Sequence, residues 1–124
     1  MNVIKVNWSD IKHIPETYDT GGASFSGHRQ KQQWFAIENL DTICCVSKTL
    51  FVSRDIARIC SIWVHPVFRK KGLATFMINH QVKHAKALKF KKIQAISKEK
   101  IFQNYGFTDT ERYKKGSAIW ELML

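Results

Sequence analysis

Residues 64–75, which read VHPVFRKKGLAT, combine residue types that are suited to binding a phosphorylated ligand. Pro66 ends a strand-like apolar run, a basic turn follows, and Gly72 stands where a helical pattern begins. The first turn of a helix has unpaired N–H groups and a partial positive charge, and a glycine lets ligand oxygens approach this backbone closely. The segment therefore predicts a pyrophosphate site, with an ordinary helix start and surface cations as the alternative.

The other candidate motifs for phosphate or metal binding are incomplete. The basic turn lacks the longer glycine loop of a Walker motif, and the GxGxxG fingerprint for dinucleotides is missing. His80 and His84 have the spacing of a zinc-binding helix, but Gln81 replaces the catalytic Glu and no third ligand is evident. The three cysteines lack CxxC spacing, so we expect reduced thiols and neither a metal site nor a disulfide framework.

The basic segment also resembles the acyl-CoA signature of the GNAT superfamily of N-acetyltransferases. In that signature a strand ending in Val-x-Pro precedes Gln/Arg-x-x-Gly-x-Gly/Ala, and Arg69, Gly72 and Ala74 match its three fixed places. A second block, IFQNYGF at residues 101–107, resembles the later Phe-Tyr-x-x-x-Gly-Phe block of the family. The resemblance covers residues 57–124 well and 33–52 loosely. It implies a small GNAT enzyme, whose size would suit a phage gene.

The resemblance implies that the phosphorylated ligand is acetyl-CoA. The backbone of Ile62 and Val64 would pair with the pantetheine arm as an extra strand does. The amide of Ile62 or a neighbour would stabilise the oxyanion that forms on the thioester carbonyl. Backbone amides from Lys70 to Thr75 would hold the pyrophosphate. The residues expected to bind this cofactor are Ile62, Trp63, Val64, Arg69, Lys70, Lys71, Gly72, Leu73, Ala74 and Thr75.

The residues that would move protons depart from the family pattern. The family's tyrosine acid aligns with Phe102, which has no proton to give, and its glutamate base aligns with Arg58. The candidates for catalytic roles are therefore Tyr105, Glu38 and Ser97. Tyr105 would protonate the leaving thiolate or else pack in the core, and Glu38 would act as a base through water or else be an ordinary exposed residue. Ser97 ends the fifth strand, and the usual Asn of the following helix is missing.

The function expected from these features is acetyl-CoA-dependent N-acetyl transfer, in which a primary amine attacks the thioester directly. A net charge of +10 favours an anionic or macromolecular acceptor over a polyamine, and it fits a nucleic-acid or acidic protein partner. Two alternatives stay open: a GNAT-fold protein that acts on or binds nucleic acid, and a non-catalytic binding module that lost its acid and base. The sequence does not identify the acceptor, and it is compatible with a monomer or a homodimer.

The length of 124 residues fits one domain, assigned to residues 1–124 with an acyl-CoA-binding core at 57–107 and an acceptor-side loop at 8–32. The composition, with 44% hydrophobic residues, is that of a folded chain. The four tryptophans are expected to pack in the core, with Trp8 or Trp34 as candidate walls of the acceptor site. The first residues lack a long apolar run, so we expect no signal peptide, no membrane span and a cytoplasmic protein.

The elements that would position these residues follow from hydrophobic periodicity. After Gly72 the apolar period becomes 3.6 residues, which predicts one long helix, and a short turn at 101–107 would be a reduced second helix. Alternation within residues 57–64 would place Arg58, Cys60 and Ile62 on one face. Together with the resemblance, this order predicts an α/β fold of the GNAT type, with a mixed, mostly antiparallel twisted sheet and one long central helix. The expected strands are 2–7, 32–39, 42–52, 57–64, 91–97, 107–113 and 117–124.

Overall fold

The computed structural model describes residues 2–14 and 31–124. In chain order the elements are β1 (Val3–Val6), α1 (Trp8–Ile11), β2 (Gln32–Asn39), β3 (Thr42–Phe51), β4 (Ile56–Val64), the 3-10 segment η1 (Pro66–Phe68), α3 (Leu73–Ala87), β5 (Lys92–Ser97), the 3-10 segment η2 (Lys100–Tyr105), β6 (Thr108–Lys114) and β7 (Ser117–Met123). Each predicted strand is confirmed to within about one residue at its ends. The reduced second helix that was predicted corresponds to η2.

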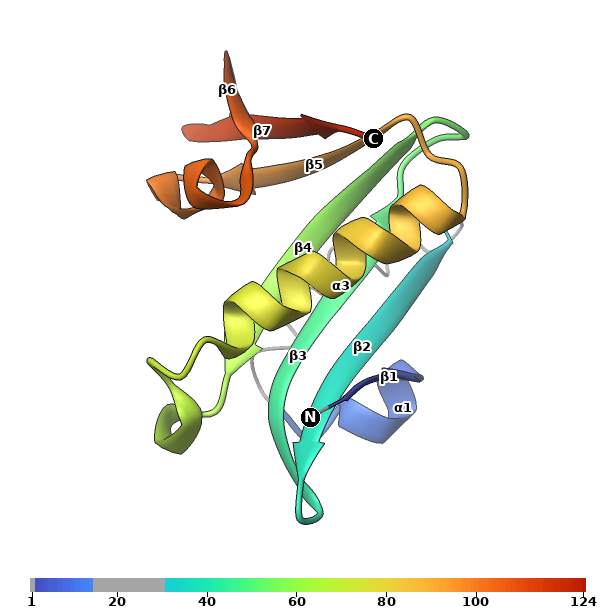
Figure 1. Cartoon of the computed structure of the whole chain (residues 1–124), viewed down its shortest axis with the longest axis vertical. Coiled ribbons are helices and arrows are strands. Elements are labelled where there is room, and N and C mark those ends of the chain that lie inside the picture. The colour runs from blue at the N-terminus through green and yellow to red at the C-terminus, as the bar shows by residue number, and fades with distance from the viewer. Residues whose placement is uncertain (1, 15–30) are drawn as a thin grey trace.

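The described strands form one sheet with the order β1-β2-β3-β4-β5-β7-β6. Every neighbouring pair is antiparallel except β4 and β5, which run parallel. A parallel connection needs a crossover, and α3 supplies it across one face of the sheet (Figure 1). The predicted mixed, mostly antiparallel sheet with one long helix is therefore confirmed.

The position of α3 on the sheet is fixed by the apolar side chains that the 3.6-residue period selects. Met77 packs in a cluster with β2 and β3, and Ile78 packs in a cluster with β4, β5 and β7. Burying such a side chain contributes roughly 1.5–3 kcal/mol. The buried Gln81 donates from Nε2 to Thr49 Oγ1 at 3.1 Å, which satisfies its amide nitrogen. These contacts hold the N-terminal turn of α3 at a defined place beside β4.

β4 and β5 pair only over their first residues. Residues Ile56–Ile59 face Lys92–Ala95 in four pairs, and beyond them the two strands diverge (Figure 1). β4 continues along β3, and β5 continues along β7. The edges that face each other beyond these pairs, Cys60–Val64 of β4 and Ile96–Ser97 of β5, are called the splay below.

A β-bulge interrupts β4 at the splay. On β3, Val46 and Lys48 are two residues apart, whereas their partners on β4, Trp63 and Cys60, are three residues apart. One extra residue shifts the alternation of all side chains that follow it. Ile62 consequently packs in the clusters under α3, whereas Trp63 packs on the opposite face of the sheet. The prediction that Ile62 shares a face with Cys60 is therefore wrong.

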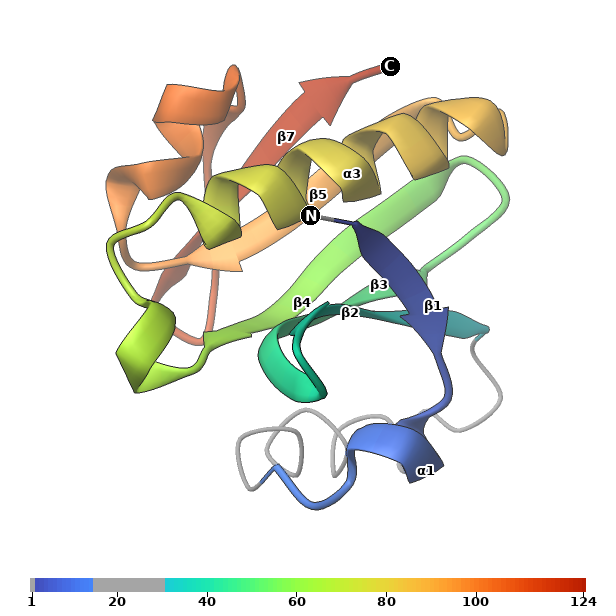
Figure 2. The same cartoon turned by 60° about the horizontal axis from the view of Figure 1, so that its bottom comes forward.

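The face of the sheet opposite α3 is covered in part by α1 (Figure 2). Ile11 and Ile14 form an apolar cluster there with Trp34, Ala36 and Val46. The predicted core packing of the tryptophans is confirmed most clearly for Trp34, which is 3% exposed.

The amino-terminal region differs in part from the irregular segment predicted at residues 8–32. α1 supplies a short helix within it, and β2 already begins at Gln32. Most of the acceptor-side loop predicted at residues 8–32 lies outside the described residues. Of the helices in residues 2–14 and 31–124, none is long and apolar enough to cross a membrane.

Candidate functional site

The N-terminal turn of α3 presents backbone N–H groups that have no acceptor within the helix. The first helical hydrogen bond joins the N–H of Phe76 to the C=O of Gly72 at 3.0 Å, and no side chain caps this end. The N–H groups of Leu73, Ala74 and Thr75 are therefore available to a ligand. Gly72 has a φ of +81°, and a Cβ there would meet nothing within 4 Å. An anion can thus approach this turn from open space.

The basic turn before α3 is anchored to β4 by one of its own side chains. Arg69 donates from Nε to the C=O of Val64 at 2.9 Å. His65 accepts the N–H of Val67 at Nδ1 at 3.1 Å, which starts η1. Lys70 and Lys71 are exposed. Arg69 therefore positions the turn, while the two lysines raise the positive potential around the uncapped amides.

The open edge of β4 offers hydrogen-bonding groups to an extended ligand. The N–H of His65 donates to Cys44 O in β3 at 2.7 Å. Backbone groups of successive strand residues point to opposite sides, so those of Val64 point away from β3 and into the splay. The C=O of Val64 already accepts from Arg69, but a carbonyl oxygen has a second lone pair. The backbone of Val64 therefore keeps the hydrogen-bonding capacity that the expected pairing with a ligand requires.

The candidate acid Tyr105 reaches the N-terminal turn of α3. Its hydroxyl lies 3.0 Å from Thr75 Oγ1, and either group can donate. Phe102, where the family has its tyrosine, is 7% exposed and packs against the rings of Tyr105 and Phe107. Phe102 is therefore a core residue, and Tyr105 brings the only phenol of η2 to the predicted cofactor loop.

The other two catalytic candidates lie at different distances from the splay. Ser97 stands at the end of β5, where its Oγ accepts the N–H of Glu99 at 3.0 Å. Glu38 is exposed near the end of β2, where it pairs with Ile43 of β3. Because β3 separates β2 from β4, Glu38 lies roughly two strand spacings, ~10 Å, from β4. The structure therefore places Ser97 at the splay and does not bring Glu38 there.

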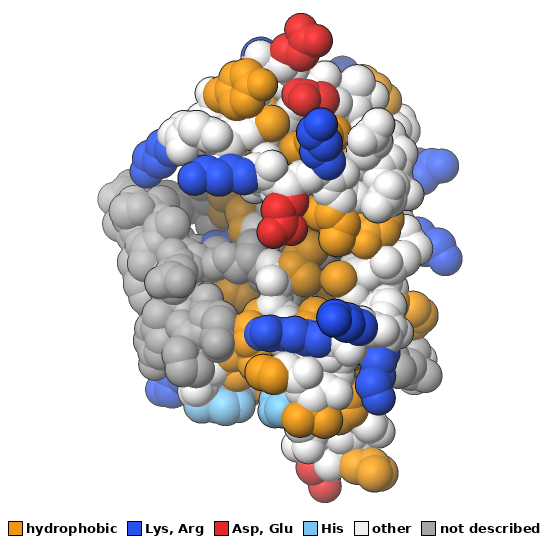
Figure 3. Space-filling model, turned by 90° about the vertical axis from the view of Figure 1, so that its left-hand side faces the viewer, with side chains coloured by type: hydrophobic (Ala, Val, Ile, Leu, Met, Phe, Trp, Pro, Cys, Tyr) orange, Lys and Arg blue, Asp and Glu red, His pale blue; other side chains and the backbone are white. Residues whose placement is uncertain are grey.

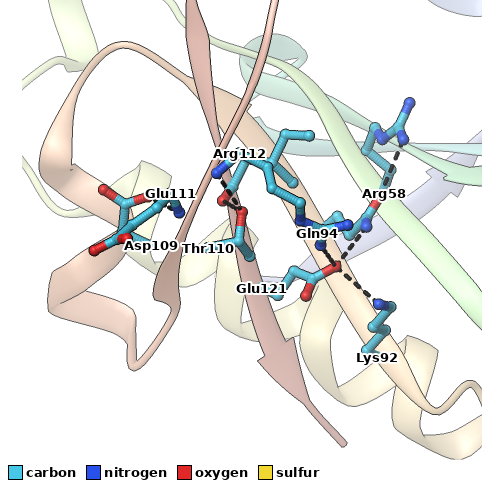
Figure 4. Close-up of polar contacts among 9 residues, drawn as sticks. Arg58, Lys92, Gln94, Asp109, Thr110, Glu111, Arg112 and Glu121 are labelled. Atoms are coloured by element: carbon cyan, nitrogen blue, oxygen red, sulfur yellow. Dashed lines mark hydrogen bonds and ion pairs between the residues drawn. The ribbon is translucent and has the colours of Figure 1, made fainter.

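The face of the sheet opposite α3 carries a row of polar side chains across β4, β5 and β7 (Figure 4). Arg58 donates from Nη2 to Gln94 Oε1 at 3.0 Å, and Gln94 donates from Nε2 to Glu121 Oε2 at 2.6 Å. The same carboxylate oxygen pairs with Lys92 at 2.9 Å and with Arg112 at 3.1 Å. Burial raises the pKa of Glu121, but these hydrogen bonds and charges outweigh it and hold the pKa below its usual value.

Two further groups lie on this face beside the splay. Lys48 of β3 is 2% exposed, pairs with Cys60 across the strands and lies 5.5 Å from the centre of the Trp34 ring. Burial lowers the pKa of Lys48. Burial also raises the pKa of Cys60, which the charges of Lys48, Arg58 and Lys114 only partly offset, so this thiol stays protonated at neutral pH.

The charge distribution is visible on the side toward which the splay opens (Figure 3). There, Lys and Arg side chains lie above and below a largely hydrophobic strip, and an acidic side chain lies at the margin of this strip. This surface suits a ligand that has an apolar or extended middle part and negatively charged ends.

The cysteine and histidine motifs do not form a site of their own. All three cysteines are free, and burial raises the pKa of Cys45 to about 12. His80 and His84 each pack with the ring edge-on to Phe35 at 5.1 Å. No group of three or more potential metal ligands occurs within the two described stretches.

Sequence reasoning missed Lys48 and the row from Arg58 to Glu121. The sequence contains one signal for Lys48. Lys48 stands two residues after Val46 in the apolar run TICCVSKTLFV, so the strand alternation places both side chains on the same face, at a core position. A lysine is almost never fully buried without a reason. No comparable signal marks Gln94 or Glu121, since their contacts join residues 27–36 positions apart in the chain.

Residues 9–105 match the family model described as the acetyltransferase (GNAT) family. No curated protein sequence matches the chain. Several solved structures are similar at 14% identity. The IAA acetyltransferase from Bacillus cereus has a TM-score of 0.80 over 99% of both chains. The Rv2747 protein from Mycobacterium tuberculosis, in complex with CoA, has a TM-score of 0.77 over 100% of this chain and 99% of that chain.

A third similar structure is a chimera of spermidine N-acetyltransferase from Vibrio cholerae, with a TM-score of 0.73 and 14% identity. It covers 99% of this chain and 96% of that chain. At this level of identity the three structures establish the fold alone. None of them comes from a phage, so the suggested phage origin gains no support.

Proposed function

Because the chain belongs to the GNAT acetyltransferase family, we propose that it is an acetyl-CoA-dependent N-acetyltransferase that acts on a primary amine. The observation that carries this proposal is the uncapped N-terminal turn of α3 beside the open edge of β4. A diphosphate fits the turn, and a chain that contains amides fits the edge as an added strand. Acetyl-CoA contains both parts in one molecule.

The chain's own backbone would provide most of the binding. The N–H groups from Leu73 to Thr75 would hold the pyrophosphate, and Lys70 and Lys71 would add electrostatic attraction. The unpaired edge of β4 at Ile62 and Val64 would bind the pantetheine arm. The structure from Mycobacterium tuberculosis supports this choice of ligand, because it was solved in complex with CoA.

The transfer forms one bond and breaks one. The nitrogen of a neutral amine attacks the thioester carbonyl carbon, the C–N bond forms, the C–S bond breaks, and the proton lost by nitrogen ends on the released thiol. The backbone N–H of Ile62 or a neighbour in the bulge would stabilise the negative charge on the carbonyl oxygen. No covalent intermediate with the protein is needed.

Two side chains are proposed for the proton that the thiolate receives. Tyr105 is the first, because its hydroxyl lies at the first turn of α3. Ser97 is the second, because it ends β5 at the splay and its hydroxyl proton is free while Oγ accepts from Glu99. Glu38 lies too far away for direct contact, so we assign the deprotonation of the incoming ammonium group to solvent.

Calorimetry with acetyl-CoA and a thiol-release assay with an amine panel test this proposal together. We expect saturable binding of acetyl-CoA and release of CoA that depends on the amine. Binding without any amine-dependent release would identify a non-catalytic binding module. The absence of binding would contradict the proposal outright.

A further inference from the structure

We propose that a groove at the C-terminal end of α3 binds a partner protein through a segment that is acidic and carries an apolar side chain. The groove, called the distal groove below, lies between the end of α3, the turn from β3 to β4 and the start of β2 (Figure 1). Its volume is about 540 Å³. Since α3 has 15 residues, the groove is ~22 Å from the cofactor loop at the other end of the helix. The inference therefore concerns a second site and does not depend on the proposed acetyl transfer.

The floor of the distal groove is apolar. Phe51 at the end of β3 and Phe90 after α3 line it, and their rings stack with centroids 5.3 Å apart and planes inclined by 21°. Leu88, the C-cap of α3, also lines the groove and is 50% exposed. A single exposed leucine is ordinary, but this one adjoins two half-buried rings in a concave surface. An apolar side chain of a partner can therefore pack there.

Cations surround this floor without counter-ions. Lys31 before β2 and Arg54 in the turn from β3 to β4 line the groove, and Lys89 stands between two lining residues. All three are exposed, and none forms an ion pair with an acidic residue in the two described stretches. The acidic residue of the same turn, Asp55, already pairs with Lys91 at 3.8 Å. The groove therefore has a positive potential that complements an acidic segment.

The backbone holds the lining cations in place. The N–H of Phe51 donates to the C=O of Lys31 at 2.8 Å, which joins the start of β2 to the end of β3. The N–H of Val52 donates to the C=O of Ile56 at 2.9 Å, which closes the turn that contains Arg54. A surface that is already formed loses less entropy when a partner binds.

Lys89 stands at a position where glycine is the usual residue. α3 ends in a Schellman motif, in which the N–H of Phe90 donates to Ala85 O at 3.1 Å and the N–H of Lys89 donates to Lys86 O at 3.0 Å. These bonds satisfy carbonyls that would otherwise repel an anion. Lys89 has the left-handed φ of +71°, which strains any residue that has a side chain. The protein therefore has a positive charge beside the groove at a cost in stability, as is common at functional sites.

A protein segment fits the distal groove better than a nucleic acid does. Single-stranded nucleic acid binds mainly by stacking its bases on exposed aromatic faces. The rings of Phe51 and Phe90 stack on each other and are only half exposed, whereas the most exposed apolar side chain of the groove is the aliphatic Leu88. An aliphatic surface with cations around it favours a hydrophobic side chain that is flanked by carboxylates.

Fluorescence anisotropy with labelled peptides tests this inference. The probe peptide carries a central Leu-Phe pair between runs of Glu and Asp. One control peptide has Ser in place of the pair, and the other has Gln and Asn in place of the acidic residues. We expect saturable binding of the probe at about 0.1 M salt, where charges are screened beyond ~10 Å. Each control should bind at least about tenfold more weakly, the effect of losing a main contact of an interface.

Two substitutions test whether the probe binds in the distal groove. Leu88→Ser removes the exposed apolar side chain, and Arg54→Gln removes a lining cation. Each should lower the affinity for the probe about tenfold. Lys83→Gln removes an exposed cation of α3 outside the groove and should leave the affinity nearly unchanged. Circular dichroism identifies any variant that fails to fold.

Lys89→Gly is the sharpest test, because its effects on folding and on binding should have opposite signs. Glycine relieves the backbone strain, so the melting temperature should rise by a few degrees. Loss of the charge should weaken the probe about threefold or more. Lys115→Gly is the matched control, since Lys115 is also exposed, has a φ of +51° and stands in the turn from β6 to β7. It removes the same charge and the same kind of strain, but the affinity should stay nearly unchanged.

The outcomes that would overturn the inference are distinct. Absence of probe binding would do so, and equal binding of the probe and the serine control would show unspecific charge attraction. Unchanged affinity in both groove variants, or equal weakening by Lys89→Gly and Lys115→Gly, would place the binding elsewhere. A single-stranded oligo(dT) that displaces the probe and binds more tightly would assign the groove to nucleic acid. None of these results depends on acetyl-CoA, so the proposed function stands or falls separately.

Discussion

The hydroxyl of Tyr105 lies 3.0 Å from Oγ1 of Thr75, a residue of the first turn of α3. The contact joins the 3-10 segment after β5 to the helix end that we assign to the pyrophosphate. Tyr105 and the cofactor loop are 30 residues apart in the chain, and the divergence of β4 and β5 brings them to the same opening. The Tyr105 hydroxyl is therefore held beside the candidate cofactor loop by Thr75, a residue of that loop.

Tyr105→Phe tests whether this phenol delivers a proton. If it protonates the thiolate, kcat should fall by about 10²-fold or more, the usual scale of general acid catalysis, with little change in acetyl-CoA affinity. Steady-state kinetics and calorimetry measure the two quantities. Thr75→Val is the matched control, since it removes the hydroxyl partner but keeps the phenol. An unchanged kcat in Tyr105→Phe would shift the role to Ser97 or to water.

Phe102→Tyr should destabilise the fold and not restore the family's acid. The ring of Phe102 is 7% exposed and contacts Tyr105 and Phe107, so an added hydroxyl would be buried without an evident partner. We expect a loss of about 1–3 kcal/mol in the free energy of unfolding. Urea denaturation measures it. An equally stable variant with a higher kcat would contradict the core role of Phe102.

Gly72→Glu tests the assignment of the cofactor loop. The substitution places a side chain and a negative charge in the open space in front of the uncapped amides, so the rise in melting temperature on adding acetyl-CoA should disappear. Gly116→Glu is the matched control. Gly116 has the same φ of +81° and the same empty surroundings, so it shares the backbone strain without touching the loop. Equal acetyl-CoA affinity in both variants would refute the assignment.

The two histidines of α3 should make the fold sensitive to acid. Burial lowers the pKa of His80 and of His84, and the charge of Lys5 on β1 lowers both further. The unfolded chain therefore binds protons at a higher pH than the folded chain does. Stability is complete above the unfolded value of about 6.5 and decreases as the pH falls through the lower folded values.

The measurement for this effect is the free energy of unfolding between pH 7.5 and pH 5, taken with urea. His84→Gln should flatten the decrease below about pH 6.5. Lys83→Gln should flatten it slightly, because the charge of Lys83 contributes to the lowered pKa of His80. A decrease that both variants retain in full would have to come from other groups.

The exposed lysines of α3 and of the turn that follows it test the nucleic-acid alternative. Lys83, Lys86 and Lys89 are exposed, whereas Lys92 pairs with Glu121 and is not a free surface charge. If the function involves nucleic acid, changing the three exposed lysines to Gln should reduce the log–log salt slope of duplex binding by about two to three units. Under the proposal made here, duplex DNA should leave the rate of amine acetylation unchanged.

Most of the fold could be predicted from the sequence, because strand alternation and helical periodicity are patterns among residues that are close together in the chain. The start of α3 at Gly72 could be predicted for the same reason, since a glycine before a helical period is a local feature. The β4 bulge could not be assigned, because its cause lies in the pairing with β3 and not in the strand's own pattern. That single residue moved Ile62 to the other face of the sheet.

The polar side chains on the sheet face opposite α3 could not be predicted, for a different reason. Arg58 was noticed only as a departure from the family base, since nothing in the sequence shows that Gln94 and Lys48 lie beside it. Glu38 was considered because carboxylates are the usual bases, and the strand order alone separates it from the splay. Contacts between strands that are far apart in the sequence therefore determine which candidate residues lie at the splay.

The short pairing of β4 with β5 divides the sheet into two parts. We expect each part to unfold as a cooperative unit of its own. Antiparallel ladders connect β1 to β4 and join β5, β7 and β6, whereas the two ladders meet in four residue pairs, the Arg58–Gln94 hydrogen bond and the packing of α3. Amide protons along this seam should exchange with solvent before those inside either ladder. A cut between Ala87 and Lys92 would leave two fragments with intact ladders. If such fragments reassemble, the proposed acetyl transfer would report their association, since the candidate site combines β4 and α3 of one fragment with Ser97 and Tyr105 of the other.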